Sequence, residues 1–176
     1  MQDLKEFRKI QGDDTLGGMI ICETSEQARR LYDVFQEEWQ KYQPKPIKIK
    51  LPDGTFVVGE PEVDYKSKYR PLKAGIILHD TDDKETRKQT VKDFKKNMTV
   101  DILIVFNMLL TGFDAPRLKR LYFGRKLKDH NLLQAITRVN RPYPGMRYGF
   151  VIDFADIKRN FKETNEAYLQ ELNRFN

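Results

Sequence analysis

Cysteine and long apolar runs are both scarce in this sequence. Cys22 is the only cysteine among 176 residues, which excludes a disulfide framework and a metal site built from cysteines. The longest nearly apolar run, residues 102–110, is interrupted by Asn107 and is about half as long as the roughly 20 residues of a membrane span. The N-terminus has acidic residues and no apolar core, unlike a signal peptide. We therefore expect a cytoplasmic protein with no membrane partner, in which Cys22 is a buried strand residue.

The charge is distributed unevenly along the chain. The formal net charge of +6 arises from 32 basic and 26 acidic residues. Residues 117–147 contain nine basic residues and one acid, Asp129, whereas the rest of the chain has 23 basic and 25 acidic residues. A concentrated positive segment is typical of a surface that binds nucleic acid or nucleotide phosphates. A solvated basic face that binds nothing would have the same composition.

Short apolar runs alternate with helix-like segments along most of the chain. Apolar residues make up 39% of the sequence, which is enough to bury a core. Strands are expected at residues 19–22, 74–78, 101–106, 121–123 and 149–152, and helices at 25–42, 82–96, 131–140 and 155–175. This alternation predicts βαβ crossovers and a largely parallel sheet that is covered by helices on both faces. The polar residues 1–16 are expected to form a tether.

Residues 43–73 interrupt the alternation and read as an insertion. Apolar residues alternate with lysines before residues 52–54, a Pro-Asp-Gly turn, and an apolar run follows the turn, so we expect a β-hairpin. The same stretch contains a short pattern of Asp53, Asp64 and Lys66 that also occurs in metal-dependent nucleases. Because the turn signal is the stronger of the two, we favour the hairpin and expect no metal site.

Candidate ligand-binding residues fall in three segments. Ligands of open α/β sheets bind beyond the carboxyl ends of the strands. There we expect Thr24 and Ser25 after the first strand, residues 107–116 after the strand DILIVF, and the helix that begins at Asn131. A plain strand-to-helix loop would equally explain residues 107–116 taken alone.

The helix from Asn131 carries the most specific of these patterns. Gln134, Arg138 and Arg141 lie on one stripe at i, i+4 and i+7, and the apolar residues occupy the opposite face. Two guanidinium groups one turn apart suit the oxygens of a phosphate. An ordinary basic face would form ion pairs instead, but Asp129 is the only acid nearby. The stripe therefore favours a phosphate ligand.

Taken together, these segments resemble the second RecA-like domain of superfamily 2 helicases and translocases. The matching segments are MIICETSEQARRLYDVF for motif IV, LLTGFDAP for motif V and NLLQAITRVNRPY for motif VI. The last two closely resemble the R (restriction) subunit of type I restriction–modification enzymes. The resemblance covers residues 17–154 apart from the insertion at 43–73, with a C-terminal helix at 155–176. It implies a three-layer RecA-like (P-loop NTPase-like) α/β domain with a mainly parallel sheet, helices on both faces and a β-hairpin insertion.

The resemblance also implies a role for each matching residue. Arg138 and Arg141 match the motif VI arginines that reach the γ-phosphate of ATP, and they are the expected catalytic residues. Residues expected near the nucleotide are Gln134, Asp114 and Gly112. Residues expected at the nucleic-acid backbone are Thr24, Ser25, Thr111 and His79. The sequence departs from the family at Asn107, where Asp is frequent, and at Thr137, where a small residue is usual.

The function implied is one half of an ATP-dependent DNA translocase. The sequence contains no G-x-x-x-x-G-K-[ST] motif and no DExx box, so ATP and Mg²⁺ would be held mainly by a first RecA-like domain. We expect the chain alone to be inactive. The expected partners are double-stranded DNA, the first RecA-like and nuclease domains of the full-length chain, and the modification and specificity subunits. Two alternatives remain open: the second lobe of another superfamily 2 helicase or remodeller, and a non-catalytic nucleic-acid-binding module.

Overall fold

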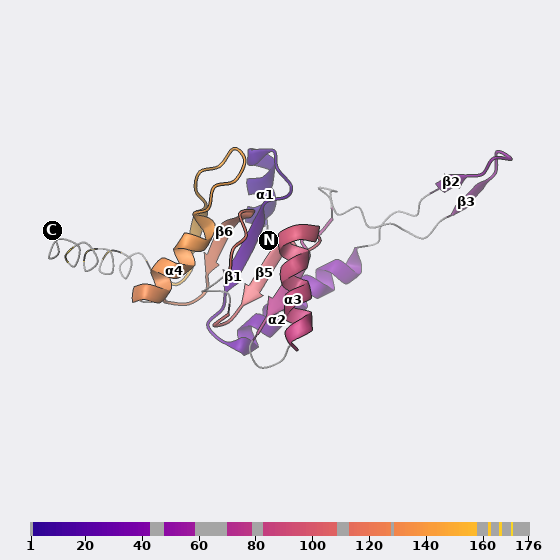
Figure 1. Cartoon of the computed structure of the whole chain (residues 1–176). Helices are drawn as coiled ribbons and strands as arrows, with labels where there is room; N and C mark the ends of the chain where they lie inside the picture. The colour runs from indigo at the N-terminus through magenta and orange to yellow at the C-terminus, as the bar shows by residue number, and fades with distance from the viewer. Residues whose placement is uncertain are drawn as a thin grey trace.

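Five parallel strands form the central sheet of the protein (Figure 1). The structure is a computed structural model, and it describes residues 2–42, 48–58, 70–78, 83–108, 113–127, 129–157, 162, 166 and 170. In spatial order the strands are β4 (Ala74–Ile77), β5 (Ile102–Val105), β1 (Gly17–Ile21), β6 (Leu118–Phe123) and β7 (Phe150–Asp153). Every neighbouring pair is parallel. The expected parallel sheet is confirmed, and the doubly apolar β5 lies in its interior.

Helices cover both faces of this sheet. The helices are α1 (Gln2–Gln11), α2 (Ser25–Lys41), α3 (Lys84–Lys92) with its π-helical extension η1 (Asp93–Asn97), and α4 (Asp129–Val139). Buried residues of α1 and α2 join one apolar cluster, and those of η1 and α4 join the other. Successive strand residues alternate between the clusters, as Ile104 and Val105 of β5 do. The result is the three-layer α/β fold that the sequence predicts.

The first residues of the chain do not form the expected tether. α1 packs on the sheet through Leu4 and Phe7, which are both buried. Arg8 is also buried, and its Nη2 atom lies 2.9 Å from a carboxylate oxygen of Asp101, at the start of β5. Three apolar residues in a polar helix, of which Ile10 is exposed, are a weak pattern, and the ion pair joins residues far apart in sequence. Local sequence reasoning therefore missed this helix.

The insertion forms the expected hairpin from β2 (Lys48–Lys50) and β3 (Phe56–Val58), which pair antiparallel. The turn is closed by Asp53, whose Oδ1 atom accepts a hydrogen bond of 2.9 Å from the Thr55 amide. All the side chains of both strands are exposed, and the hairpin lies away from the sheet in Figure 1. Asp64 and Lys66 of the nuclease-like pattern lie outside the described residues.

The C-terminal end of the domain is described only in part. Ile157 is buried in the same cluster as α4, but most of the helix expected at 155–176 lies outside the described residues. Of the helices that the structure describes, none is long and apolar enough to cross a membrane.

Candidate functional site

The predicted site residues lie at two opposite edges of the sheet. Thr24 and Ser25 lie in the short connection from β1 to the start of α2, at the edge where the parallel strands end. α4 begins after β6 ends and runs back to the start of β7, so Arg138 and Arg141 lie at the edge where the strands begin. The backbone carbonyl of Arg141 accepts a hydrogen bond from the Lys119 ammonium, at the start of β6. The expectation that all three segments meet at the carboxyl edge is therefore wrong for the two arginines.

At the amino edge, the end of the LLTGFDAP segment meets the end of α4. The Nη1 atom of Arg138 donates a hydrogen bond of 3.0 Å to the carbonyl oxygen of Phe113. The Nε atom of Arg141 lies 3.6 Å from a carboxylate oxygen of Asp114, and the two side chains are 46% and 61% exposed. The fold thus brings together Arg138, Arg141 and Asp114, which the sequence could only list separately.

The face of α4 beside these residues has the expected division. Leu132, Ala135 and Val139 are buried in the core, whereas Gln134 and Arg138 are half-buried. The hydroxyl of Thr137 donates a hydrogen bond of 2.8 Å to the carbonyl oxygen of Gln134. The residue that departs from the family pattern is thus accommodated by a bond within the helix.

Two residues outside the motifs hold the end of α4 in place. A Cβ atom on Gly149 would lie 2.5 Å from the carbonyl oxygen of Val139, so only glycine permits this close approach before β7. Lys119 is fully buried, and burial lowers the pKa of its ammonium. Its bond to the Arg141 carbonyl puts positive charge at the C-terminal end of a helix, where the helix dipole favours it. Neither role is visible in the sequence.

Much of the basic segment is used inside the fold. Arg117 is 3% exposed and donates hydrogen bonds to the carbonyl oxygens of Thr15, Phe94 and Val100. Burial lowers the pKa of Arg117 to about 10. The guanidinium of Arg120 lies 4.2 Å from the centre of the Phe7 ring. These cations and Lys119 stabilise the domain, so residues 117–147 do not form one continuous anion-binding face.

The carboxyl edge contains the motif IV residues and one arginine that sequence reasoning did not single out. Thr24 caps α2, because its hydroxyl oxygen accepts a hydrogen bond of 3.0 Å from the Gln27 amide. Arg125 follows β6, and its guanidinium lies 5.4 Å from the centre of the Phe106 ring. The sequence signal that could have indicated Arg125 is its position as a cation just after the strand expected at residues 121–123. Of the other predicted residues, those outside the described part of the chain are Thr111, Gly112 and His79.

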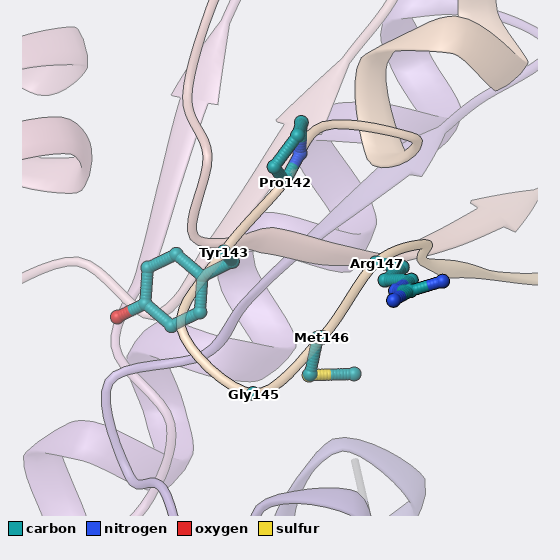
Figure 2. Close-up of a pocket in the computed structure, with 5 residues that line it drawn as sticks. All are labelled: Pro142, Tyr143, Gly145, Met146 and Arg147. Atoms are coloured by element: carbon teal, nitrogen blue, oxygen red, sulfur yellow. The ribbon is translucent and has the colours of Figure 1, made fainter.

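A pocket of about 580 Å³ lies in the loop that follows Arg141 (Figure 2). Its lining residues are Pro142, Tyr143, Gly145, Met146 and Arg147. Figure 2 shows the side chains of Tyr143 and Arg147 extending to opposite sides of the loop. The hydroxyls of Tyr143 and Thr15 share a hydrogen bond of 2.7 Å, which ties the loop to the segment before β1. In the described ranges, no group of three or more His, Cys, Asp or Glu could hold a metal ion.

Comparison with known proteins decides the family. The family model described as type I restriction enzyme subunit R domain 3 matches residues 15–156. The chain belongs to this family of type I restriction enzyme R subunits. The resemblance carried by the motif V and motif VI segments is thereby confirmed.

Curated relatives of this R-subunit domain are much longer than the chain. The putative type I restriction enzyme MjaIXP endonuclease subunit of Methanocaldococcus jannaschii is 34% identical over 169 residues, which cover 96% of this chain and 14% of the relative. The type I restriction enzyme SauCOLORF180P endonuclease subunit of Staphylococcus aureus is 41% identical over 80 residues, which cover 45% of this chain and 8% of the relative. The chain thus spans a small part of the relatives that it matches.

Solved structures confirm the fold class of the R-subunit domain. The DEAD-box helicase domain 2 of Mss116p, bound to an RNA duplex, has a TM-score of 0.61 at 16% identity and covers 95% of this chain and 53% of its own. The C-terminal domain of the DEAD-box protein Dbp5 has a TM-score of 0.54 at 18% identity. This match covers 98% of the present chain and 79% of the Dbp5 chain. At these identities the likeness shows the fold, which is that of a second RecA-like helicase domain.

Proposed function

We propose that this R-subunit domain is the second RecA-like half of an ATP-dependent DNA translocase in a type I restriction endonuclease. The observation that carries the proposal is the group of Arg138, Arg141 and Asp114 at the amino edge of the sheet. Motifs V and VI, which are separate in the sequence, meet there in a chain that belongs to the R subunits. This supports a site that faces a nucleotide held by another domain.

The donor set at the amino edge fits the terminal phosphate of ATP. Arg141 is half-exposed, and its 3.6 Å pair with the exposed Asp114 is loose, so its guanidinium can exchange that carboxylate for phosphate oxygens. Arg138 is oriented by its bond to Phe113. ATP, when bound between the two halves, supplies the phosphoanhydride whose hydrolysis drives movement. An arginine placed at the transferred phosphoryl group is worth roughly 10³-fold or more in rate. Gln134, on the same helix, would lie near the nucleotide.

Nucleic acid would lie at the opposite edge, against Thr24 and Ser25. The chain between the edges supports coupling of the two sites, because residues 107–116 begin after β5 at the carboxyl edge and end beside Arg141 at the amino edge. Asn107, at the start, has a positive φ of 53°. A movement of Asp114 as a nucleotide enters would therefore act on a segment that starts beside the DNA.

A structural neighbour holds both kinds of ligand. S. cerevisiae Dbp5, which is 18% identical with a TM-score of 0.52, is bound to RNA and ADP BeF3.

The full-length R subunit provides the test. Arg141→Ala should lower DNA-stimulated ATP turnover by about 10³-fold, because the charge facing the transferred phosphoryl group is lost. DNA affinity should be nearly unchanged, since Arg141 lies at the other edge of the sheet. Arg30→Ala is the matched control, because Arg30 is exposed on α2 and pairs only with Glu26 among the described residues, at 2.6 Å. Normal ATP turnover in Arg141→Ala would refute the proposal.

The remaining parts of the motor belong to the longer protein in this proposal. Mg²⁺ would be held mainly by a first RecA-like domain, and a nuclease domain with modification and specificity subunits would complete the enzyme. The 176-residue chain alone should neither hydrolyse ATP nor translocate. A non-catalytic nucleic-acid-binding module is less well supported, because Arg117 and Lys119 of the basic segment are buried in the fold.

A further inference from the structure

Arg125 lies at the middle of the carboxyl edge of the sheet. β1 is flanked by β5 and β6, and the chain leaves β6 close to the end of β1 (Figure 1). The Gly124 amide donates a hydrogen bond of 2.8 Å to the carbonyl oxygen of Ile21. A Cβ atom on Gly124 would lie 2.9 Å from that oxygen, so glycine is needed for the chain to pass there. Arg125, the next residue, is thereby placed beside the end of β1.

The Arg125 side chain crosses over the end of β1. Its guanidinium lies 5.4 Å from the centre of the ring of Phe106, which follows β5 on the far side of β1. The segment from Glu23 to Ser25, which leads into α2, starts at the strand end between them. A guanidinium that lies on an aromatic face is held in orientation by the ring.

The charge of Arg125 is not neutralised by the part of the chain that the structure describes. Its Nε atom is buried and makes no hydrogen bond there. Arg125 forms no ion pair with the described residues, and the carboxylate of Glu23 acts on it only as a nearby charge. Burial lowers the pKa of Arg125, and Glu23 opposes this effect. Arg117, by contrast, donates to three carbonyl oxygens, so Arg125 differs from the cations that stabilise the fold.

We propose that Arg125 binds a backbone phosphate of the DNA that crosses the carboxyl edge, beside Thr24 and Ser25. This inference rests on the proposed function, and it adds a DNA-contacting residue that lies outside motifs IV, V and VI. A phosphate is the ligand that a planar guanidinium held on an aromatic ring recognises, and it is the same on every base pair. Arg125 therefore contributes affinity without sequence preference.

The test uses the full-length R subunit and a DNA duplex of mixed sequence that carries no recognition site. The dissociation constant is measured at several salt concentrations for the unchanged protein and for Arg125→Ala. Loss of one charged hydrogen-bonded contact should weaken binding at low salt by about 10-fold or more. The slope of log Kobs against log salt should become shallower by about 0.9, because one fewer counterion is released. Thermal unfolding shows whether each variant is folded.

Three further variants separate a phosphate contact from a structural role. Arg125→Lys should keep the salt slope and lose part of the affinity, because the charge remains and the planar fork is lost. Phe106→Leu should weaken binding at an unchanged slope, because the charge of Arg125 remains but the aromatic ring that orients its guanidinium is removed. Arg147→Ala is the matched control, since Arg147 is an exposed arginine at the amino edge, and it should change neither quantity.

The outcomes distinguish this inference from the proposed function. An unchanged affinity and slope in Arg125→Ala would overturn the inference, and so would weaker binding at an unchanged slope. A changed KM for ATP with unchanged DNA affinity would assign Arg125 to the nucleotide and also overturn it. If Arg125→Ala is unfolded, the salt slopes of Arg125→Lys and Arg125→Gln test the inference instead. The slope of Arg125→Gln should be shallower than that of the unchanged protein, because the charge is lost, and the slope of Arg125→Lys should not. The proposed function depends instead on DNA-stimulated ATP turnover and its loss in Arg141→Ala.

Discussion

Asp101 lies at the centre of a buried ion cluster, and Asp101→Asn should destabilise the domain strongly. Its carboxylate accepts hydrogen bonds of 2.5 and 2.9 Å from the Arg70 guanidinium and one of 2.7 Å from the Lys73 amide. Arg8 of α1 forms the ion pair on the other side. The cluster thus ties the first helix and the last residues of the insertion to the start of β5.

The expected magnitude follows from burial. The side chains of Asp101, Arg70 and Arg8 are 1%, 4% and 7% exposed, so water cannot replace a lost partner. Asparagine has almost the same shape, but it leaves two buried guanidinium groups without a counter-charge. Removing one partner of a buried ion pair costs about 3–5 kcal/mol. This loss is a large part of the roughly 5–15 kcal/mol by which a domain is stable.

Urea denaturation of the 176-residue chain at pH 7 measures the effect. With a slope of about 2 kcal/mol per M, the midpoint should fall by about 1.5–2.5 M. The pH dependence is a second readout. Burial alone would raise the pKa of Asp101, but the bonds from Arg70 and the charges of Arg8 and Arg70 outweigh it, so this pKa is lowered. The carboxylate therefore stabilises the fold fully above the unfolded value of 3.8, and this contribution is lost as the pH falls through the lower native pKa.

The difference between the unchanged chain and Asp101→Asn should therefore shrink as the pH falls below that unfolded value. Asp53→Asn is the control, because Asp53 also has a lowered pKa but lies in the exposed hairpin turn. Its midpoint should be unchanged. An Asp101→Asn midpoint within about 0.5 M of the original at pH 7 would contradict the assigned cost of the buried charges.

One further substitution tests the packing at the end of α4, and one chemical modification tests the burial of Cys22. Gly149→Ala should lower stability by about 1–3 kcal/mol in the same urea assay, because the new Cβ meets the Val139 carbonyl at 2.5 Å and the end of α4 must shift. Gly18→Ala, whose Cβ would meet only side chains at 3.3 Å, should cost less, and equal costs would argue against the backbone clash. Cys22 is 1% exposed, and burial raises its pKa to about 11, so iodoacetamide at pH 8 should not label it without denaturant. Rapid labelling of the native chain would contradict that burial.

Elements whose signals are local could be predicted from the sequence. The helix expected at 25–42 is α2, Ser25–Lys41, and its Thr24 cap is the one that the sequence pattern indicates. The hairpin, with its turn at residues 52–54, could be predicted from the sequence equally well. In the candidate site, the placement of Gln134 and Arg138 on one face of α4 followed from helical spacing, whereas Arg141, expected on the same stripe, lies two residues beyond the end of the helix. These signals span a few residues, so period, cap and turn chemistry are sufficient to detect them.

Contacts between distant residues could not be predicted in this way. The sequence predicts a tether where α1 forms, because the stability of α1 depends on Asp101 and on the apolar cluster beneath it. The assumption that ligands bind at the carboxyl edge misplaced Arg138 and Arg141, because α4 runs from one edge of the sheet to the other. The position of Arg125 across the end of β1 depends on the strand order, which no local pattern contains.

The sequence by itself determined the alternation of strands and helices after α1, the family, and which residue types were available for a phosphate site. The tertiary structure alone decided what each charge does. Arg117 and Lys119 belong to the same basic segment as Arg141, yet the first two are buried and bonded to backbone carbonyls while Arg141 is half-exposed. The physical reason is that a charge is either compensated inside the fold or free for a ligand, according to partners that lie far away in the sequence.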